Sequence, residues 1–198
     1  MTIFDRAREI IMNPRVTWQA IKGEAIDLKQ VFLNYAAPLA LIPAVSSLIG
    51  ISLFGLRMPA GHLIRAPFFE SLLVSVLTYA VSLLAIYITG YIIYGLAPYF
   101  GSKADLNLAM KLVIYSATPF WLAGIFSILP GLGILSILGL YGVYLMVVGL
   151  PELLGTPPDK VIWYTAAIII SLIVVNFILS TVIVASVFGP MYMRMMAL

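Results

Sequence analysis

The sequence predicts an all-α polytopic membrane protein, a bundle of five transmembrane helices preceded by an amphipathic interfacial helix. Of its 198 residues, 63% are hydrophobic and 10% are charged, whereas a soluble domain averages about 45–50% apolar and about 25% charged. The mean hydropathy of +1.10 agrees with this. Five long stretches are apolar all round rather than alternating, which favours helices over membrane strands. A soluble globular domain is therefore excluded.

The first thirty residues hold nine of the nineteen charged residues and form a segment of their own, residues 1–30, before a membrane domain at 31–198. Apolar residues recur at helical spacing from Ile3 to Ile11, with charges on the other side, which predicts an amphipathic helix in the membrane interface. Asn13-Pro14 ends it, and a second helix runs through Trp18, whose indole we expect at the headgroup level, half apolar and half wet. The alternative is that this segment simply caps the bundle.

Five apolar segments follow, and each can supply the roughly 17–25 residues that cross a hydrocarbon core of about 30 Å. The third and fourth are joined by Leu129-Pro130-Gly131-Leu132-Gly133, an uncharged run that predicts a tight hairpin turn. The alternative is one long kinked helix, but the combined stretch is far too long for one crossing. The five predicted spans are Val31–Leu56, Ser71–Leu96, Leu112–Leu129, Leu132–Leu150 and Val161–Phe188.

The distribution of lysine and arginine predicts the orientation of the bundle. With five spans, one side receives eight of these residues and the other side three. We therefore expect the N-terminus in the cytoplasm and the C-terminus outside, in what is most simply a prokaryotic cytoplasmic membrane. The eight are Arg6, Arg8, Arg15, Lys22, Lys29, Lys103, Lys111 and Lys160, and the three are Arg57, Arg65 and Arg194.

Prolines interrupt two of the spans. Pro38 and Pro43 in the first span and Pro119 in the third each remove a backbone donor, so the helices should kink or locally unwind. Tyr35 and Tyr115 stand shortly before two of these prolines. Paired broken helices can mark a transport site, whereas prolines that only shape packing are commoner.

The remaining candidate residues are polar or aromatic side chains in the third, fourth and fifth spans. The third span contains Trp121, and the glycine-rich fourth contains Tyr141 and ends at Pro151-Glu152. Asn176 is an amide deep in the fifth span, and we expect it to hydrogen-bond a neighbouring helix. Lys111 and Glu152 fall at span ends, where long side chains can reach water.

The sequence offers no template for catalysis or for cofactor binding. It has no cysteine and a single histidine, His62, so no thiolate or histidine-based metal site is expected. Neither a nucleophile with a histidine base nor a glycine-rich phosphate loop is recognisable. A basic stripe with interleaved aromatics is also lacking, so nucleic acid is not an expected partner.

Several stretches of the chain resemble the Ypt/Rab-interacting (Yip) family of membrane domains. Those stretches are YAAPLALIPA at 35–44, YSATPFWLAGIF at 115–126, the Pro130-Gly131 turn, LGLYGVYLMVVGLPELL at 138–154 and Pro158-Asp159-Lys160. Asn13-Pro14 and Trp18 resemble the bacterial members.

The resemblance implies five spanning helices with a cytoplasmic N-terminus. Eukaryotic relatives bind prenylated small GTPases and act in vesicle trafficking between the endoplasmic reticulum and the Golgi. This sequence lacks their long N-terminal region and has Asn34-Tyr35-Ala36-Ala37-Pro38 where they have Asp-Leu-Tyr-Gly-Pro. Small-GTPase binding is therefore doubtful for this chain, whose short form resembles prokaryotic members of unassigned function.

The sequence thus favours a non-enzymatic membrane scaffold or adaptor that organises lipids or partner membrane proteins, as a homo- or hetero-oligomer. The alternative is a transporter or channel for a small or lipidic solute. That alternative requires a polar cavity near Pro38, Pro43 and Pro119, so the packing around these prolines distinguishes the two hypotheses.

Overall fold

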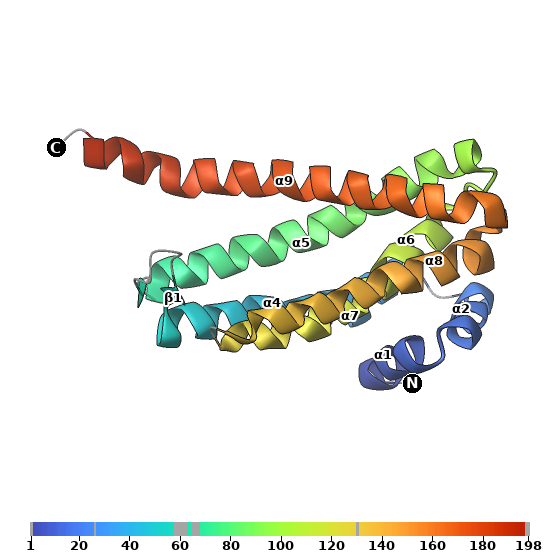
Figure 1. Ribbon diagram of the computed structural model, residues 1–198, viewed down its shortest axis with the longest axis horizontal. Coiled ribbons are helices and arrows are strands. Elements are labelled where there is room, and N and C mark those ends of the chain that lie inside the picture. The colour runs from blue at the N-terminus through green and yellow to red at the C-terminus, as the bar shows by residue number, and fades with distance from the viewer. Residues whose placement is uncertain (1, 26, 58–62, 65–67, 130, 197–198) are drawn as a thin grey trace.

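The computed structural model describes residues 2–25, 27–57, 63–64, 68–129 and 131–196, and within them the side chains except those of 56–57, 63–64 and 182–196. Five helical segments in this part of the chain are long and apolar enough to cross a membrane, and they form an elongated bundle (Figure 1). They are Leu28–Phe54, Phe68–Phe100, Leu106–Ile128, Leu132–Leu154 and Pro158–Thr181. The predicted five-span, all-α architecture is confirmed, with each span beginning a few residues earlier than expected or at the same residue.

The first span is not a regular helix. It begins as α3 (Leu28–Val31), widens into a π-helix (Phe32–Ala36), continues as α4 (Ala37–Ile49) and widens again at Gly50–Phe54. Pro38 lies in the first turn of α4, shortly after the first π-helix. A proline nitrogen cannot donate to the carbonyl one turn before it, which explains why the regular α-helical pattern is lost at this point. The predicted local unwinding is therefore present before Pro38, whereas Pro43 lies inside α4, which continues through it without a break.

The third span is broken at its proline. Helix α6 (Leu106–Ser116) ends before Ala117, and α7 (Thr118–Ala123) starts with Pro119 in its first turn. A 3₁₀ helix (Gly124–Ile128) completes the span. Gly131, whose φ is 114°, makes the turn into the fourth span, as the hairpin prediction requires.

The remaining elements are longer and more regular. A pair of two-residue antiparallel strands, β1 (Leu56–Arg57) and β2 (Leu63–Ile64), follows the first span. The second span is α5 (Phe68–Leu96) with a 3₁₀ turn at Ala97–Phe100, the fourth is a 3₁₀ helix (Leu132–Leu140) continued by α8 (Tyr141–Leu154), and the fifth lies in α9 (Pro158–Met196).

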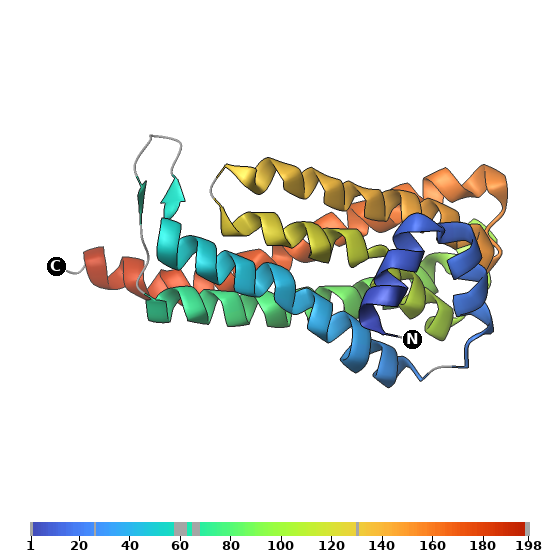
Figure 2. The same cartoon turned by 90° about the horizontal axis from the view of Figure 1, so that it is seen from below.

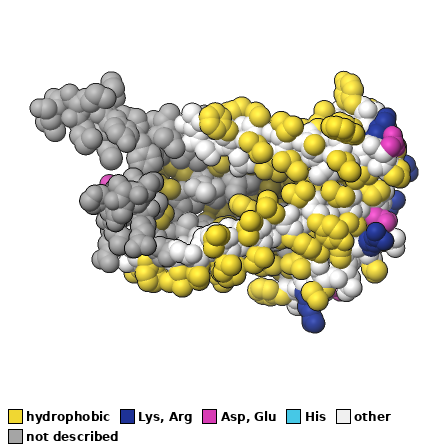
Figure 3. All heavy atoms as spheres, viewed as in Figure 1, with side chains coloured by type: hydrophobic (Ala, Val, Ile, Leu, Met, Phe, Trp, Pro, Cys, Tyr) yellow, Lys and Arg dark blue, Asp and Glu magenta, His cyan; other side chains and the backbone are white. Residues whose placement is uncertain are grey.

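The third span forms the centre of the bundle. It is 72% buried over its most apolar window, whereas the other four spans are 22–28% buried. The buried faces of α5, α6, α8 and α9 meet at one end of the molecule, and the outward faces of the spans are apolar (Figure 3). The charged side chains in that view gather mainly at this same end, as expected for groups that leave the hydrocarbon.

Two short helices precede the first span. Helix α1 (Ile3–Met12) is amphipathic and runs across the long axis of the bundle, and α2 (Pro14–Gly23) follows after a break at Asn13 (Figure 2). Thr2 and Asp5 form a capping box at the start of α1, and the Thr2 hydroxyl and backbone N–H hold the pKa of Asp5 below its usual value. The predicted amphipathic helix and its Asn-Pro break are both present.

Candidate functional site

The N-terminal helix pair packs onto the bundle through Trp18. The indole is completely buried, and its Nε1 donates a 3.1 Å hydrogen bond to the Leu145 carbonyl oxygen of α8. Gly149 leaves the space for it, since a Cβ at that position would lie 2.8 Å from Trp18 Cε2. The prediction that this indole is half exposed to water at the headgroup level is wrong, because α2 folds against α8 and covers it.

An aromatic cluster continues from Trp18 into the bundle. The Trp18 ring contacts the Tyr115 ring edge-on at a centroid distance of 6.3 Å, and the Tyr115 ring contacts the Tyr35 ring at a centroid distance of 4.7 Å. The Tyr35 hydroxyl and Thr118 Oγ1 are hydrogen-bonded at 2.8 Å, and Thr118 is fully buried. The N-terminal segment, the first span and the third span therefore meet through three aromatic rings and one polar pair.

A polar cluster lies beside these rings and contains Arg6, Glu24 and Lys111. Lys111 is only 4% exposed, and its Nζ donates to the carbonyl oxygens of Ile21 at 3.2 Å and Glu24 at 2.6 Å. Arg6 forms an ion pair with the Glu24 carboxylate. Lys111 thus supplies a donor to two carbonyl groups at the C-terminal end of α2, where the backbone donors of the helix run out; the Ile21 carbonyl also accepts from the Glu24 backbone N–H.

The expectation that Lys111 reaches water from the end of its span is wrong. The lysine lies at the start of the third span, where a long side chain could reach the surface. It is buried because the end of α2 lies over it and supplies two carbonyl acceptors. The cluster therefore fastens the N-terminal segment to the central helix.

Replacing Lys111 with methionine is expected to loosen this fastening. Methionine keeps the apolar stem but loses the hydrogen bonds of the lysine to the Ile21 and Glu24 carbonyls, at a cost of about 1–2 kcal/mol. Trypsin should then cut faster at Lys22 in the folded protein. Lys103→Met is the matched control: Lys103 is exposed, so this variant should be cut at Lys22 at the wild-type rate. Equal cleavage rates for the wild type and Lys111→Met would contradict the proposed role of Lys111.

The structure brings four of the predicted site residues into one packed region around the helix breaks. Tyr35, Tyr115 and Trp121 are at most 5% exposed, and Pro119 is buried beside Thr118. Pro38 and Pro43 are half-buried, and Pro43 packs so closely against Gly124 that no Cβ would fit there. Pro43 and Pro119 therefore lie in closely packed surroundings.

The other predicted residues lie apart from that region. The Tyr141 hydroxyl donates to the Ile11 carbonyl oxygen at 2.8 Å, and Glu152 Oε2 accepts from Gln19 Nε2 at 3.3 Å, so both contact the N-terminal segment. Pro151 is exposed within α8. Asn176 Nδ2 donates to the Leu172 carbonyl oxygen of its own helix, so the expected bond to a neighbouring helix is replaced by one within α9.

Sequence reasoning missed the residues that fasten the N-terminal segment. The sequence places Trp18 and Lys111 at the water interface, it marks Arg6 only by its charge, and it does not single out Glu24 or Thr118. One signal was available, because a lysine followed by a long apolar stretch needs a polar partner if it is not at the surface. The identity of that partner depends on a contact 87 residues away in the chain.

Two surface hollows open beside the N-terminal segment. One of about 460 Å³ borders the outer side of α1, and one of about 430 Å³ lies between the end of α2 and the start of α6. Both are lined mainly by charged and amide side chains. Among the described residues, no group of three or more histidine, cysteine, aspartate or glutamate side chains could hold a metal ion. The site as a whole is a docking arrangement between an interfacial helix pair and a membrane bundle.

Five spans, four of them around a proline-broken central one, and a short amphipathic segment that caps them define a polytopic integral membrane protein. The Yip1 domain matches residues 8–195, and the chain belongs to the Yip1 domain family. The resemblance inferred from residues 35–44, 115–126 and 138–154 is thereby confirmed.

Two curated relatives support this membership. Inner membrane protein YohC of Escherichia coli strain K12 is 22% identical over 185 residues, covering 91% of this chain and 95% of the relative. The protein of the same name from E. coli O6:H1 matches with the same identity and coverage. No solved structure gives a significant match. The relatives agree with an integral membrane location for this chain.

Proposed function

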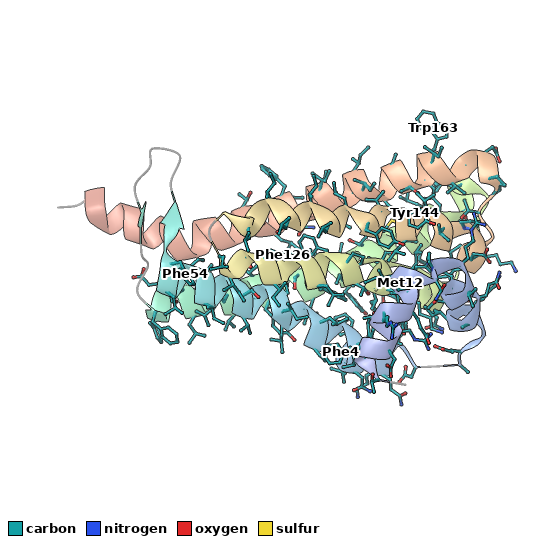
Figure 4. The ribbon with its side chains drawn as sticks, turned by 60° about the horizontal axis from the view of Figure 1, so that its bottom comes forward. Phe4, Met12, Phe54, Phe126, Tyr144 and Trp163 are labelled. Carbon is teal, nitrogen blue, oxygen red and sulfur yellow. The ribbon has the colours of Figure 1, made fainter. Side chains whose placement is uncertain are left out.

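We propose that this chain is a non-enzymatic integral membrane scaffold or adaptor, with the N-terminal segment as its contact surface. The observation that carries the proposal is the docking of α1 and α2 onto the bundle through Trp18 and Lys111. This docking orders a helix pair whose outer side chains remain free, with Phe4 74% exposed, Met12 68% exposed and Val16 70% exposed. Figure 4 shows Phe4 and Met12 on α1, away from the packed side of that helix.

The transport alternative has less support. Its distinguishing feature is a polar cavity near the proline breaks, and there Thr118, Tyr35 and Trp121 are buried in packed surroundings. The two hollows described above lie instead beside the N-terminal segment. We propose further that this segment faces the cytoplasm, supported by the eight-to-three excess of lysine and arginine on its side.

Site-specific photo-crosslinking in native membranes tests the adaptor proposal. A photoreactive residue is placed at Met12 or Val16 in the helix pair, and as a matched control at Ile173, which is 62% exposed on a lipid-facing part of α9. An adduct with the same protein in every preparation, formed from the N-terminal positions and not from position 173, is the expected result. Adducts only with lipid at all three positions, together with solute flux in reconstituted vesicles, would overturn the proposal in favour of transport.

A further inference from the structure

We infer that the N-terminal segment is also a binding surface for anionic phospholipid headgroups, made by Arg8, Arg15 and Lys29. This inference deepens the proposed function, because it names the lipid class on which the scaffold would act. It rests on three observations: where these cations lie relative to the membrane, which charges near them are already paired, and which apolar side chains flank them.

The three cations belong to the two N-terminal helices and to the start of the first span. Arg8 is on α1, which runs across the bundle axis as a helix in the interface plane does (Figure 2). Arg15 is in the first turn of α2, directly after α1, and Lys29 is in the first turn of the first span. All three side chains are exposed.

The acidic residues of the segment are engaged within the protein. Asp5 belongs to the capping box of α1, and Glu9 and Glu24 both lie within 4.0 Å of Arg6. Asp27 accepts a hydrogen bond from the Lys29 backbone N–H at 3.3 Å, at the start of α3. In the described part of the chain, by contrast, Arg8, Arg15 and Lys29 form no ion pair. Their charges are therefore not held in a direct ion pair within this part of the chain, and their side chains are free to reach an anionic group outside it.

Exposed apolar side chains stand on the same helix faces as two of these cations. Phe4, Arg8 and Met12 follow one another at intervals of four along α1, and Leu33, 55% exposed, is four residues beyond Lys29. An interfacial helix uses this arrangement to place its apolar groups among the acyl chains while the guanidinium reaches the phosphates. The combination of exposed apolar and cationic side chains on one helix face therefore fits a lipid surface.

Lys22 offers an internal comparison. It is exposed and has the same charge, but it lies at the other end of α2, beside a hollow that Asp27 and Asp105 also line. The residue one turn before it on α2, Trp18, is buried, so Lys22 lacks the exposed apolar neighbour that Arg8 has in Phe4 and Met12. We therefore expect Lys22 to contribute little to lipid selectivity.

The test uses the full-length protein in vesicles of phosphatidylcholine with spin-labelled phosphatidylglycerol or spin-labelled phosphatidylcholine. Electron spin resonance measures the association of each labelled lipid with the protein, and the wild type is expected to prefer phosphatidylglycerol. The triple variant Arg8→Gln, Arg15→Gln, Lys29→Gln should lower that preference at least about fivefold, since each cation near a membrane surface contributes about a factor of five. High salt should weaken the wild-type preference in the same direction.

Lys22→Gln is the matched control and should keep the wild-type preference. Because the four substituted side chains are exposed, thermal unfolding should be the same for all variants, which separates lost lipid binding from lost folding. An unchanged preference in the triple variant, or an equal loss in Lys22→Gln, overturns the lipid inference. Photo-crosslinking from Met12 and Val16 is scored independently, so failure of the lipid inference and failure of the adaptor proposal are distinguishable.

Discussion

Replacing Trp18 with alanine is expected to destabilise the protein by about 3–5 kcal/mol, the range for removing a large aromatic side chain from a packed site. The indole is completely buried against Leu145 and the surface left by Gly149, and it also donates a hydrogen bond to the Leu145 carbonyl. Alanine would leave a cavity and remove the indole's hydrogen bond to the Leu145 carbonyl. The free energy of unfolding in mild detergent measures the loss.

Trp18→Phe separates packing from hydrogen bonding. Phenylalanine fills most of the space but cannot donate to Leu145, so the expected loss is smaller, about 1–2 kcal/mol. Faster tryptic cleavage at Arg15 and Lys22 in the alanine variant should accompany the loss, because the helix pair is then less firmly held. A Trp18→Ala protein as stable and as resistant as the wild type would show that the segment is not fastened through this residue.

Replacing Gly142 with valine is expected to cost about 3 kcal/mol or more, because it forces α8 away from the end of α6. Gly142 lies on α8 where the chain meets the end of α6, and even one added Cβ would overlap the Ser116 carbonyl oxygen. A backbone atom cannot rotate away as the tip of a side chain can, so the helices themselves must shift. Small residues at helix interfaces commonly allow this kind of close approach in membranes.

Gly95→Ala is the control for this experiment. Gly95 lies on α5 with no atom within 4 Å of an added Cβ, so alanine should leave stability unchanged or raise it by up to about 1 kcal/mol through helix propensity. Gly142→Ala should fall between the valine variant and the wild type. Thermal unfolding of the three variants in one detergent measures the order, and equal effects at positions 95 and 142 would rule out a packing role for Gly142.

The sequence determined the spans better than their packing. Length and apolar composition locate each crossing, and a proline that cannot donate marks where the first and third spans lose regular helix, at Pro38 and Pro119. These are local properties, so a single sequence is enough. Which span lies at the centre is not local, because every span is apolar all round and none shows which face meets protein.

In the candidate site, too, local features could be predicted from the sequence and long-range packing could not. Tyr35, Tyr115, Pro119 and Trp121 come together as neighbours of the helix breaks, where polar and aromatic residues stood out in the sequence. The surroundings of Trp18 and Lys111 could not be predicted in this way, because burial of both depends on α2 folding back onto α6 and α8. Tryptophan and lysine suit the membrane interface equally well by composition, and only the tertiary fold places them inside.

The Trp18 contact also determines when, during synthesis of the chain, the N-terminal helix pair can pack onto the bundle. Its acceptor carbonyl, that of Leu145, lies 127 residues later in the chain, and a ribosome adds roughly 5–20 residues per second. The N-terminal helix pair therefore emerges many seconds before its binding surface on α8 exists, and during that interval its apolar face has only the bilayer surface to rest on. Closure onto the bundle becomes a final step of biogenesis, completed after the fourth span has entered the membrane.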